Sequence, residues 1–485
     1  MAESASRRTD SQIGRDSEDS GRLRADAVAS RERILEAARA LIGDRRISMA
    51  EIAAAADVSR STLYRHFPTR EALLDTLADD RRDRDAQPSS QVATLSHRPP
   101  GRLGRTEPLA LDVTHVLDEV PPHLIADQLV AEARRVAGVP VALYVVDIDG
   151  SQLIRLAGSE EFPSELPAPP ALGPEIVPEG LPRFYERLRR DLRGCVGVPL
   201  WLRGRVLGLL VCIGVPVGSL DDIAKQGAAA LELANDYTDV IETARRRKPT
   251  TAAAEVQHHL LPPRVARITG AQVAGGLLPT YEVGGDWFDF VENPDGAWLA
   301  IADAAGQGPT AAGLGASALG ALRAARRSGQ DLLAAAHSMH TVIRDLGNPD
   351  FYVTAILARW HAATATLAWI NCGHPPGHIA DADGTLTELD GPSHPPLGSP
   401  RLDAEIEISS LQLDSGDRLV LVTDGITERK ITGGGRFGTD GLQRAVQAAE
   451  APTAAATAMA IQHAVTTCWT EPLQDDASLI VLAID

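Results

Sequence analysis

The chain has 485 residues, 44% of them hydrophobic, and a formal net charge of −18 at pH 7. This length predicts about three domains, and the composition is sufficient for packed cores. The acidic charge excludes a general binder of polyanions, so any contact with nucleic acid has to come from a local surface.

The cysteines and the hydropathy of the chain indicate the cellular compartment in which the protein is expected. The cysteines lie far apart without a Cys-x-x-Cys motif, which is typical of a reduced compartment and argues against structural zinc. No apolar run approaches the roughly 20 residues of a membrane span, and Arg7-Arg8 is followed by no apolar signal-peptide core. We therefore expect a cytoplasmic protein without membrane contact. The cysteines are Cys195, Cys212, Cys372 and Cys468.

The N-terminal region divides into two parts. Residues 1–24 consist mainly of Ser, Arg, Asp and Glu and are expected to be disordered. Residues 25–80 show helical periodicity, and Ser48 with Glu51 forms a capping box at the start of a short helix. A turn at Asp57-Val58 then leads into a third helix, which is the pattern of a helix-turn-helix. Its predicted core is Ile52, Val58, Leu63 and Phe67.

The third helix of this block would expose groups suited to phosphates and base edges. The run from Ile52 to Leu74 resembles the DNA-binding head of TetR-type repressors. The resemblance implies double-stranded DNA as a partner, and a homodimer, because such heads pair to read two half-sites. Basic and acidic residues nearly balance here, which leaves open a docking or dimerisation module that does not bind DNA. The predicted DNA-binding residues are Arg60, Ser61, Thr62, Tyr64, Arg65 and His66.

Residues 81–108 are expected to form a flexible linker, and residues 109–246 show a mixed α/β pattern. The run Gly197–Leu210 and the order of elements resemble a GAF sensor domain. The resemblance implies a small-molecule ligand, and a dimerisation scaffold without a ligand is the alternative. The expected elements are a helix over 122–137, strands over 141–147, 152–157, 196–202 and 206–213, and a helix over 221–244.

Residues 247–262 are interpreted as a coupling segment between the sensor and a C-terminal domain that spans 263–485. One helix is expected through Asn235–Arg247 and a second over Ala252–Leu261. A rotation or register shift of this helix pair could move the hairpin described next. We therefore expect the pair to transmit a signal from the sensor.

Residues 280–308 predict two antiparallel strands joined by a tight turn at 293–296. If Asn293 lies opposite Gly296, then Asp286 lies opposite Asp303. Directly opposed residues share a sheet face with Cβ atoms about 5 Å apart. Two carboxylates this close repel each other, so we expect a cation between them, and oxygen ligands favour Mg²⁺ or Mn²⁺. The alternative is a hairpin whose acids point into solvent.

Two later strands end or begin with acids. A buried strand over 417–425 ends at Asp424, and the final buried strand begins with Asp475 and Asp476. If these strands are antiparallel, Asp424 and Asp475 meet at one sheet edge. The carboxylates of both strand pairs could then form one oxygen-rich site for two metal ions.

Several short motifs appear in a fixed order along the C-terminal half. Together they resemble the SpoIIE-like branch of the PPM metal-dependent serine/threonine phosphatases, over about residues 255–485. The resemblance implies an α+β domain with two β-sheets flanked by helices (αββα) and a centre of two Mn²⁺ or Mg²⁺ ions. The motifs are Leu260-Leu261-Pro262, Gly284–Asp289, Asp303–Gly308, Asn371–Pro376, Thr423–Glu428 and Asp475-Asp476.

The resemblance also assigns roles, residue by residue. Asp303 would bridge both metal ions, the Ala304 carbonyl would bind one of them, and Asp286 would support the site partly through water. Asp286 and Asp303 are therefore the predicted catalytic residues. The other ion would be held by Asp424 and Asp475, with Asp476 as a second candidate.

The predicted chain is thus multidomain, with an all-α helix-turn-helix head, an α/β GAF-like domain and the phosphatase domain. Its expected activity is metal-dependent hydrolysis of phosphoserine or phosphothreonine, which the resemblance places on an anti-anti-sigma-type regulator. Gln307 departs from many relatives, which have a His that could act as a general acid. The alternatives are a DNA-binding regulator with a non-catalytic phosphatase-like domain, and an interaction scaffold.

Overall fold

The computed structural model describes residues 33–38, 49–58, 62–63, 66–67, 73, 120–278, 284–402, 406–471, 473 and 475–485. The chain forms two compact units, one of residues 1–109 and 114–121 and the other of residues 110–113 and 122–485. The predicted tail over 1–24 and linker over 81–108 lie outside the described residues.

The first unit contains the predicted short helix, α2 (Met49–Ala55). Its apolar residue Ile52 is 6% exposed, and Leu63 and Phe67 are 0% and 2% exposed. Three of the residues predicted to form the head's core are therefore buried, while Val58 is half-buried.

The predicted turn after α2 is present, since Asp57 adopts a φ of 51°. Of the predicted DNA-binding residues, Thr62 and His66 are helical and half-buried. The other predicted DNA-binding residues lie outside the described part of the chain and are Arg60, Ser61, Tyr64 and Arg65.

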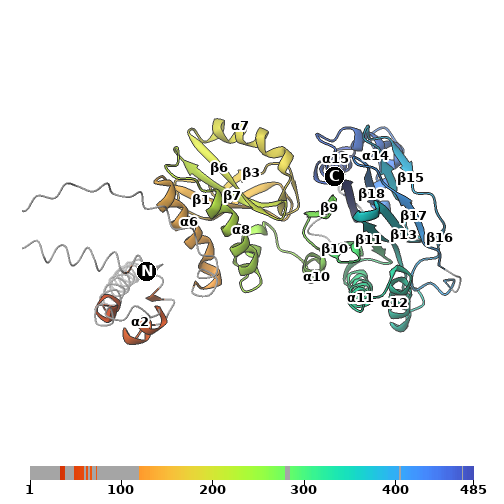
Figure 1. The fold of residues 1–485 in the computed structure, drawn as a ribbon, viewed down its shortest axis with the longest axis horizontal. Coiled ribbons are helices and arrows are strands. Elements are labelled where there is room, and N and C mark those ends of the chain that lie inside the picture. The colour runs from red at the N-terminus through yellow and green to blue at the C-terminus, as the bar shows by residue number, and fades with distance from the viewer. Residues whose placement is uncertain are drawn as a thin grey trace, which may run out of the picture. The chain divides into compact units, whose positions relative to one another are not determined.

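The GAF-like region is built on a seven-stranded sheet with the order β3-β2-β1-β7-β5-β4, in which β6 pairs with β7. Helices α6 and α8 lie on one side of it and α7 on the other (Figure 1). The strands are β1 (Val141–Val146), β2 (Gln152–Ala157), β3 (Glu165–Pro167), β4 (Ala171–Leu172), β5 (Glu175–Ile176), β6 (Cys195–Leu202) and β7 (Arg205–Ile213). The helices are α6 (Ile125–Ala137), α7 (Leu181–Asp191) and α8 (Asp221–Asn235).

The predicted hairpins of this domain are present, and its last helix differs from the prediction. Arg203 and Gly204 both have positive φ, which is the two-residue turn that matches strand twist. The single helix expected over 221–244 is broken: α8 ends at Asn235 and α9 (Val240–Arg245) follows. The helix expected through Asn235–Arg247 is wrong for the same reason, because the chain turns at residues 236–239.

The C-terminal domain contains two six-stranded sheets, as the predicted α+β sandwich requires. One has the order β10-β11-β12-β13-β16 with β17 also on β13, and the other β15-β14-β18-β19-β9-β8. The first sheet comprises β10 (Trp287–Asn293), β11 (Gly296–Ala304), β12 (Val353–His361), β13 (Thr366–Cys372), β16 (Ser393–His394) and β17 (Ser409–Gln412). The second comprises β8 (Val265–Ile268), β9 (Ala271–Leu278), β14 (His378–Ala380), β15 (Leu386–Glu388), β18 (Arg418–Val422) and β19 (Ala477–Ile484).

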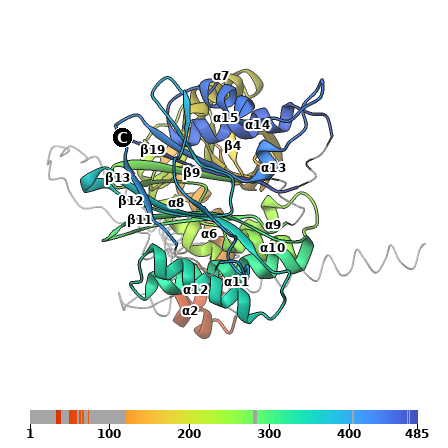
Figure 2. The same cartoon turned by 90° about the vertical axis from the view of Figure 1, so that its right-hand side faces the viewer.

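Successive side chains along each strand of this domain point to opposite faces of the sheet and pack against different layers. In β11, Trp298 and Ala300 pack against helices α11 (Gly308–Arg327) and α12 (Leu332–Asp345), and Leu299 faces the second sheet. Helices α14 and α15 cover the outer face of the second sheet (Figure 2). Their bounds are Gly438–Gln447 and Ala454–Thr467.

A buried charge cluster fixes the first sheet to α11. Asp289 is 3% exposed and accepts hydrogen bonds from Arg323 at 2.8 Å and from Arg326 at 2.9 Å. Arg323 also donates to the Leu260 carbonyl at 2.6 Å, at the end of α10 (Ala252–Leu260). One arginine therefore links β10, α10 and α11.

The second unit also contains a direct contact between the GAF-like and C-terminal domains. Glu175 in β5 is 3% exposed and accepts hydrogen bonds from Arg205 at 2.8 Å and from the Val265 backbone N–H at 2.9 Å. Leu172 and Val177 belong to the same buried apolar cluster as Val265. The two domains thus share a small buried interface in addition to α10.

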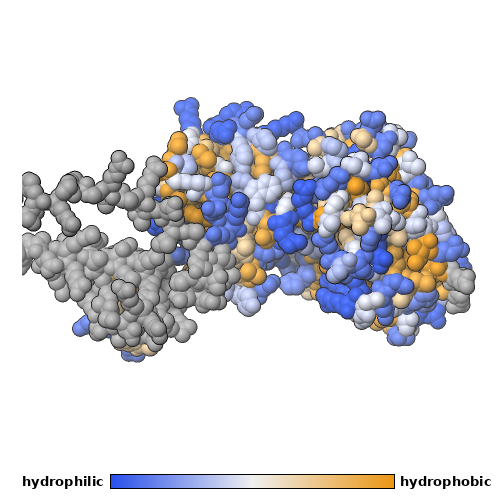
Figure 3. Space-filling view, viewed as in Figure 1, coloured by the Kyte–Doolittle hydropathy of each residue, from blue (hydrophilic) through white to orange (hydrophobic). Residues whose placement is uncertain are grey.

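Hydrophilic side chains cover much of the visible face of the described domains, interrupted by smaller hydrophobic patches (Figure 3). Within the described ranges, every helix is too short or too polar to cross a membrane.

Candidate metal centre

The predicted hairpin register is confirmed. Residue Trp287 pairs with Ala302, and the pairing continues to Asn293 with Gly296 at the turn. The pattern extends two residues further, because the Ala304 N–H donates to the Gly285 carbonyl at 3.3 Å. Asp286 therefore lies level with the end of β11.

Both hairpin acids lie on the strand face that points toward the other sheet. Phe288 and Ile301 belong to the apolar core between the sheets. Asp286 and Asp303 each lie two positions from one of these residues, and successive side chains alternate between faces. The two acids therefore sit at one end of the inter-sheet core, and Asp286 is only 3% exposed.

The second sheet supplies a hydrogen-bond donor to the same place. The Thr423 hydroxyl donates to Asp286 Oδ2 at 2.8 Å. The same hydroxyl oxygen accepts the Ser478 backbone N–H at 2.9 Å. This second bond orients the Thr423 proton toward the carboxylate.

The predicted meeting of the two later acidic strand ends is also confirmed. Strands β18 and β19 are antiparallel, with Val422 opposite Leu479. Asp424 begins the short helix α13 (Asp424–Thr427), and Asp475 lies just before β19. Burial, followed by the negative charge of Asp475, raises the pKa of Asp424.

The acids lie close enough for their charges to shift one another's pKa values. Burial, then the charges of Asp303 and Asp476, raise the pKa of Asp286 well above its ordinary value. Burial, then the charges of Asp424 and Asp475, raise the pKa of Asp303 to about 6. Burial is also the main cause that raises the pKa of Asp476 to about 7. A nearby positive charge would lower each of these pKa values again.

Gln257 on α10 bridges two of these segments. Its side-chain Nε2 donates to the Asp286 carbonyl at 2.8 Å and to Asp476 Oδ2 at 3.2 Å. The sequence motifs did not predict a role for this residue. A signal was present, since Gln257 follows Ala253 and Ala254 at helical spacing and is the polar member of a buried apolar stripe.

Two glycines allow the segments to approach closely. A Cβ on Gly284 would lie 2.3 Å from the Asp476 carboxyl group, and a Cβ on Gly285 would lie 2.2 Å from the Ala304 carbonyl oxygen. Real Cβ atoms do not approach other atoms this closely. The paired glycines therefore set how near the Ala304 carbonyl and the Asp476 carboxylate come to Asp286.

The chemistry of these groups fits divalent metal ions. All the donors are oxygens, from the carboxylates and the Ala304 carbonyl, which is the set that Mg²⁺ and Mn²⁺ prefer. In the part of the chain that the structure describes, no three His, Cys, Asp or Glu side chains already form a compact ligand group.

Two further side chains near the cluster differ in character. Gln307 is exposed at the N-cap of α11 and makes no capping hydrogen bond. His374 is 4% exposed, its Nδ1 lies 3.0 Å from the Thr354 hydroxyl, and burial lowers its pKa to about 3. His374 is therefore a neutral, packed side chain at pH 7.

Family comparisons match the chain in three places. Residues 34–77 match the bacterial regulatory proteins of the tetR family, residues 121–244 match the GAF domain, and residues 293–485 match stage II sporulation protein E (SpoIIE). The three matches follow the order predicted from the sequence.

Individual proteins are similar to parts of this chain. Phosphoserine phosphatase RsbU of Bacillus subtilis (strain 168) is 25% identical over 231 residues, which cover 47% of this chain and 68% of RsbU. Phosphoserine phosphatase RsbP of the same strain is 33% identical over 90 residues, which cover 19% of this chain and only 22% of RsbP. The solved SiaA-PP2C domain of Pseudomonas aeruginosa has 21% identity and a TM-score of 0.42, over 53% of this chain and 100% of that domain.

The family matches and the described fold lead to the same architecture. The chain joins an N-terminal region that matches the tetR family and a GAF domain to a C-terminal phosphatase domain that matches SpoIIE.

Proposed function

We propose that the C-terminal domain hydrolyses phosphoserine or phosphothreonine on a protein and that it requires two divalent ions, Mn²⁺ or Mg²⁺. One observation carries the proposal: acids from separate segments gather at one end of the sandwich, where burial and mutual repulsion raise the pKa values of most of them. Bound cations would relieve this repulsion. The acids are Asp286, Asp303, Asp424, Asp475 and Asp476.

The position of Asp303 supports the role of bridging both ions. The pKa of its carboxyl group is affected by Asp286 on one side and raised by the charges of Asp424 and Asp475 on the other. In our assignment, Asp286 and the Ala304 carbonyl serve one ion, and Asp424 and Asp475 serve the other. Asp476 remains the second candidate for the latter role, and its bond from Gln257 would orient it.

Bound divalent ions supply positive charge that favours attack of water on phosphorus and stabilises the phosphoryl oxygens. The bond from phosphorus to the serine oxygen breaks, the serine oxygen takes up a proton, and inorganic phosphate is released. Gln307 carries no titratable proton, and His374 is buried and neutral. We therefore assign this proton to solvent water.

The test is hydrolysis of a phosphoserine peptide by the full chain, with Mn²⁺, with Mg²⁺ and with a chelator. We expect metal-dependent turnover that Asp303→Asn abolishes. Asp295→Asn is the matched control, because Asp295 lies exposed at the turn of the same hairpin, away from the acid cluster. A folded chain without turnover under any of these conditions, also after Gln307→His, would support the alternative of a non-catalytic binding module.

We also propose that the GAF domain regulates the phosphatase in response to a small-molecule ligand. Two contacts support this: Gln257 links the coupling segment to the acid cluster, and Glu175 links the GAF domain to β8. A phosphatase rate that is unchanged after deletion of residues 109–246 would contradict this regulation.

For the head we propose DNA binding by a homodimer, and for the phosphatase an anti-anti-sigma-type substrate. The tetR-family match over residues 34–77 supports the first. The similarity to phosphoserine phosphatase RsbU supports a phosphoserine substrate, and the anti-anti-sigma type follows from the resemblance of the sequence motifs. The affinity of the full chain for a fluorescent DNA duplex of mixed sequence should fall as the salt concentration rises. Arg60→Ala or Arg65→Ala should reduce both this affinity and its dependence on salt.

A further inference from the structure

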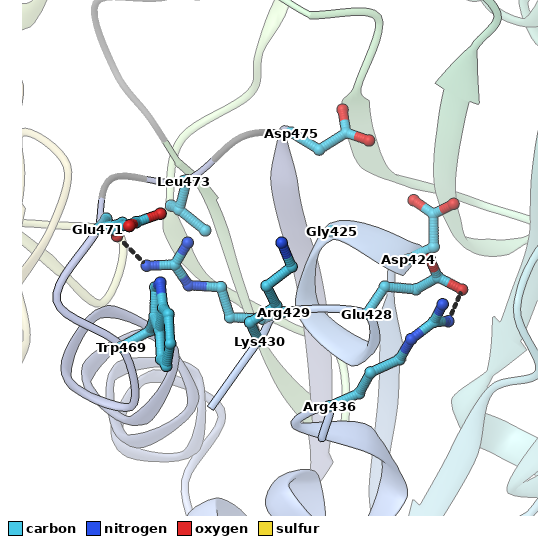
Figure 4. Close-up of a pocket in the computed structure, with 10 residues that line it drawn as sticks. All are labelled: Asp424, Gly425, Glu428, Arg429, Lys430, Arg436, Trp469, Glu471, Leu473 and Asp475. Carbon is cyan, nitrogen blue, oxygen red and sulfur yellow. Dashed lines mark hydrogen bonds and ion pairs between the residues drawn. The ribbon is translucent and has the colours of Figure 1, made fainter. Parts of the chain in front are cut away.

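A cavity of about 290 Å³ opens beside the proposed metal ligands. Asp424 and Asp475 form one edge of it (Figure 4). The rest of the wall comes from the segments that follow α13 and α15 and includes Arg429, Lys430 and Trp469 as well as the acids Glu428 and Glu471. Because small-molecule pockets begin at roughly 300 Å³, this volume suits a few side chains of an extended peptide rather than a large cofactor.

The cations around this cavity are not equivalent. Arg436 forms an ion pair with Glu428, and both side chains are more than half exposed. Arg429 is 8% exposed and donates to the Glu471 carbonyl. Both arginines are therefore already engaged by groups of the protein.

Lys430 differs from its neighbours. It is exposed, and within the described ranges its ammonium group forms no ion pair. Figure 4 shows its side chain standing between Arg429 and Glu428, with the ammonium group pointing into the cavity. An exposed lysine in this position can accept an anionic partner at small desolvation cost.

Trp469 gives the cavity an apolar wall. Its indole ring is half-buried and lines the cavity on the side of Arg429 (Figure 4). Aromatic side chains of this kind supply much of the contact area in peptide-binding sites. The cavity thus combines a free cation with an aromatic surface, which suits the aliphatic stem and carboxylate of a glutamate.

We propose that this cavity binds an acidic side chain that flanks the phosphorylated serine of the protein substrate, with Lys430 as its counter-ion. The proposal rests on the proposed phosphatase function. A phosphoserine at Asp424 and Asp475 would place its neighbours at the cavity, since each extended residue spans about 3.3 Å. A basic flanking residue would instead be repelled by the positive charges of Lys430 and of the bound metal ions.

The experiment compares peptides that are identical except for Glu, Gln or Lys at the positions next to phosphoserine, using the full chain with Mn²⁺. We expect kcat/KM to be highest for the Glu peptide, about 2- to 5-fold above the Gln peptide, through a lower KM, because partly exposed ion pairs are weak. Lys430→Glu should reverse the order of the Glu and Lys peptides, and Lys430→Arg should retain it.

Arg327→Glu is the matched control, because it makes the same charge change at the far end of α11, about 30 Å from the start of this 20-residue helix. It should leave the peptide order unchanged. Equal kcat/KM values for the three peptides, or a Glu preference that survives Lys430→Glu, would overturn the inference while the phosphatase function stands. Failure of the folded chain to hydrolyse any of the peptides, or turnover that Asp303→Asn leaves unchanged, would remove the function and the inference together.

Discussion

The Thr423 hydroxyl and the Asp286 carboxylate, 137 positions apart in the chain, form a 2.8 Å hydrogen bond across the two sheets. This bond joins the end of β18 to the start of β10. It holds the carboxylate of a proposed metal ligand in a fixed orientation, and the Ser478 N–H in turn fixes the hydroxyl.

Thr423→Val should weaken metal binding. The substitution keeps the shape of the side chain but removes the donor to Asp286 and the acceptor for the Ser478 N–H. Loss of a group that orients a metal ligand typically reduces affinity about 10- to 100-fold, and titration with Mn²⁺ measures it. Thr423→Ser should retain most of the affinity, and an unchanged affinity in the valine variant would contradict the positioning role.

Gly284→Ala should impair both metal binding and folding. The new methyl group would lie 2.3 Å from the Asp476 carboxyl group, so this carboxylate would have to move from its position beside Asp286. Overpacking of this kind costs about 1–3 kcal/mol of unfolding free energy. Denaturant unfolding measures this cost, and Mn²⁺ titration measures the affinity.

Gly320→Ala provides the control for that experiment. Gly320 lies within α11 and is exposed, and a Cβ there meets no other atom within 4 Å. Alanine should therefore stabilise the helix by about 0.5–1 kcal/mol. If both variants had the same effect, close packing at Gly284 would not be the cause.

The metal-free protein should lose stability in the phosphatase domain as pH rises. Folding raises the pKa of Asp476 from 3.8 to about 7, and that of Asp303 to about 6. The folded state therefore favours the protonated acids, so this stability is complete below pH 4 and is lost as pH passes through 6 and 7. Each pKa unit corresponds to about 1.4 kcal/mol.

This loss of stability with rising pH is measured in the full chain, with a chelator present, by hydrogen exchange of the backbone amides of β11. The exchange rates are corrected for the intrinsic rate at each pH. Addition of Mn²⁺ should reverse this loss of stability, because metal binding requires the deprotonated acids and strengthens as pH rises. A chelator-treated domain that is more protected at pH 8 than at pH 5 would contradict the prediction.

Asp289→Asn should destabilise the domain strongly. Asp289 is buried against Arg323 and Arg326, and its neutralisation leaves two arginines without their shared counter-charge. Breaking a buried ion pair in this way costs about 3–5 kcal/mol. Asp295→Asn is the control, because its pair with Arg359 is exposed and should contribute less than about 1 kcal/mol. Equal losses of unfolding free energy in the two variants would contradict this.

Local sequence patterns alone predicted a large part of the proposed metal centre. The turn at 293–296 fixed the register that places Asp286 level with Asp303, and apolar runs located β18 and β19 with acids at their meeting ends. These features depend on the two-residue repeat of strands and on turn chemistry, which are properties of a few consecutive residues.

The tertiary structure decided which distant groups complete the site. Only the packing of the two sheets brings Thr423 to Asp286, and only the docking of α10 brings Gln257 to Asp476. The break between α8 and α9 likewise escaped the helical pattern. Periodicity along the chain specifies which face of an element is buried, whereas the partner on that face is chosen by packing between segments more than a hundred residues apart.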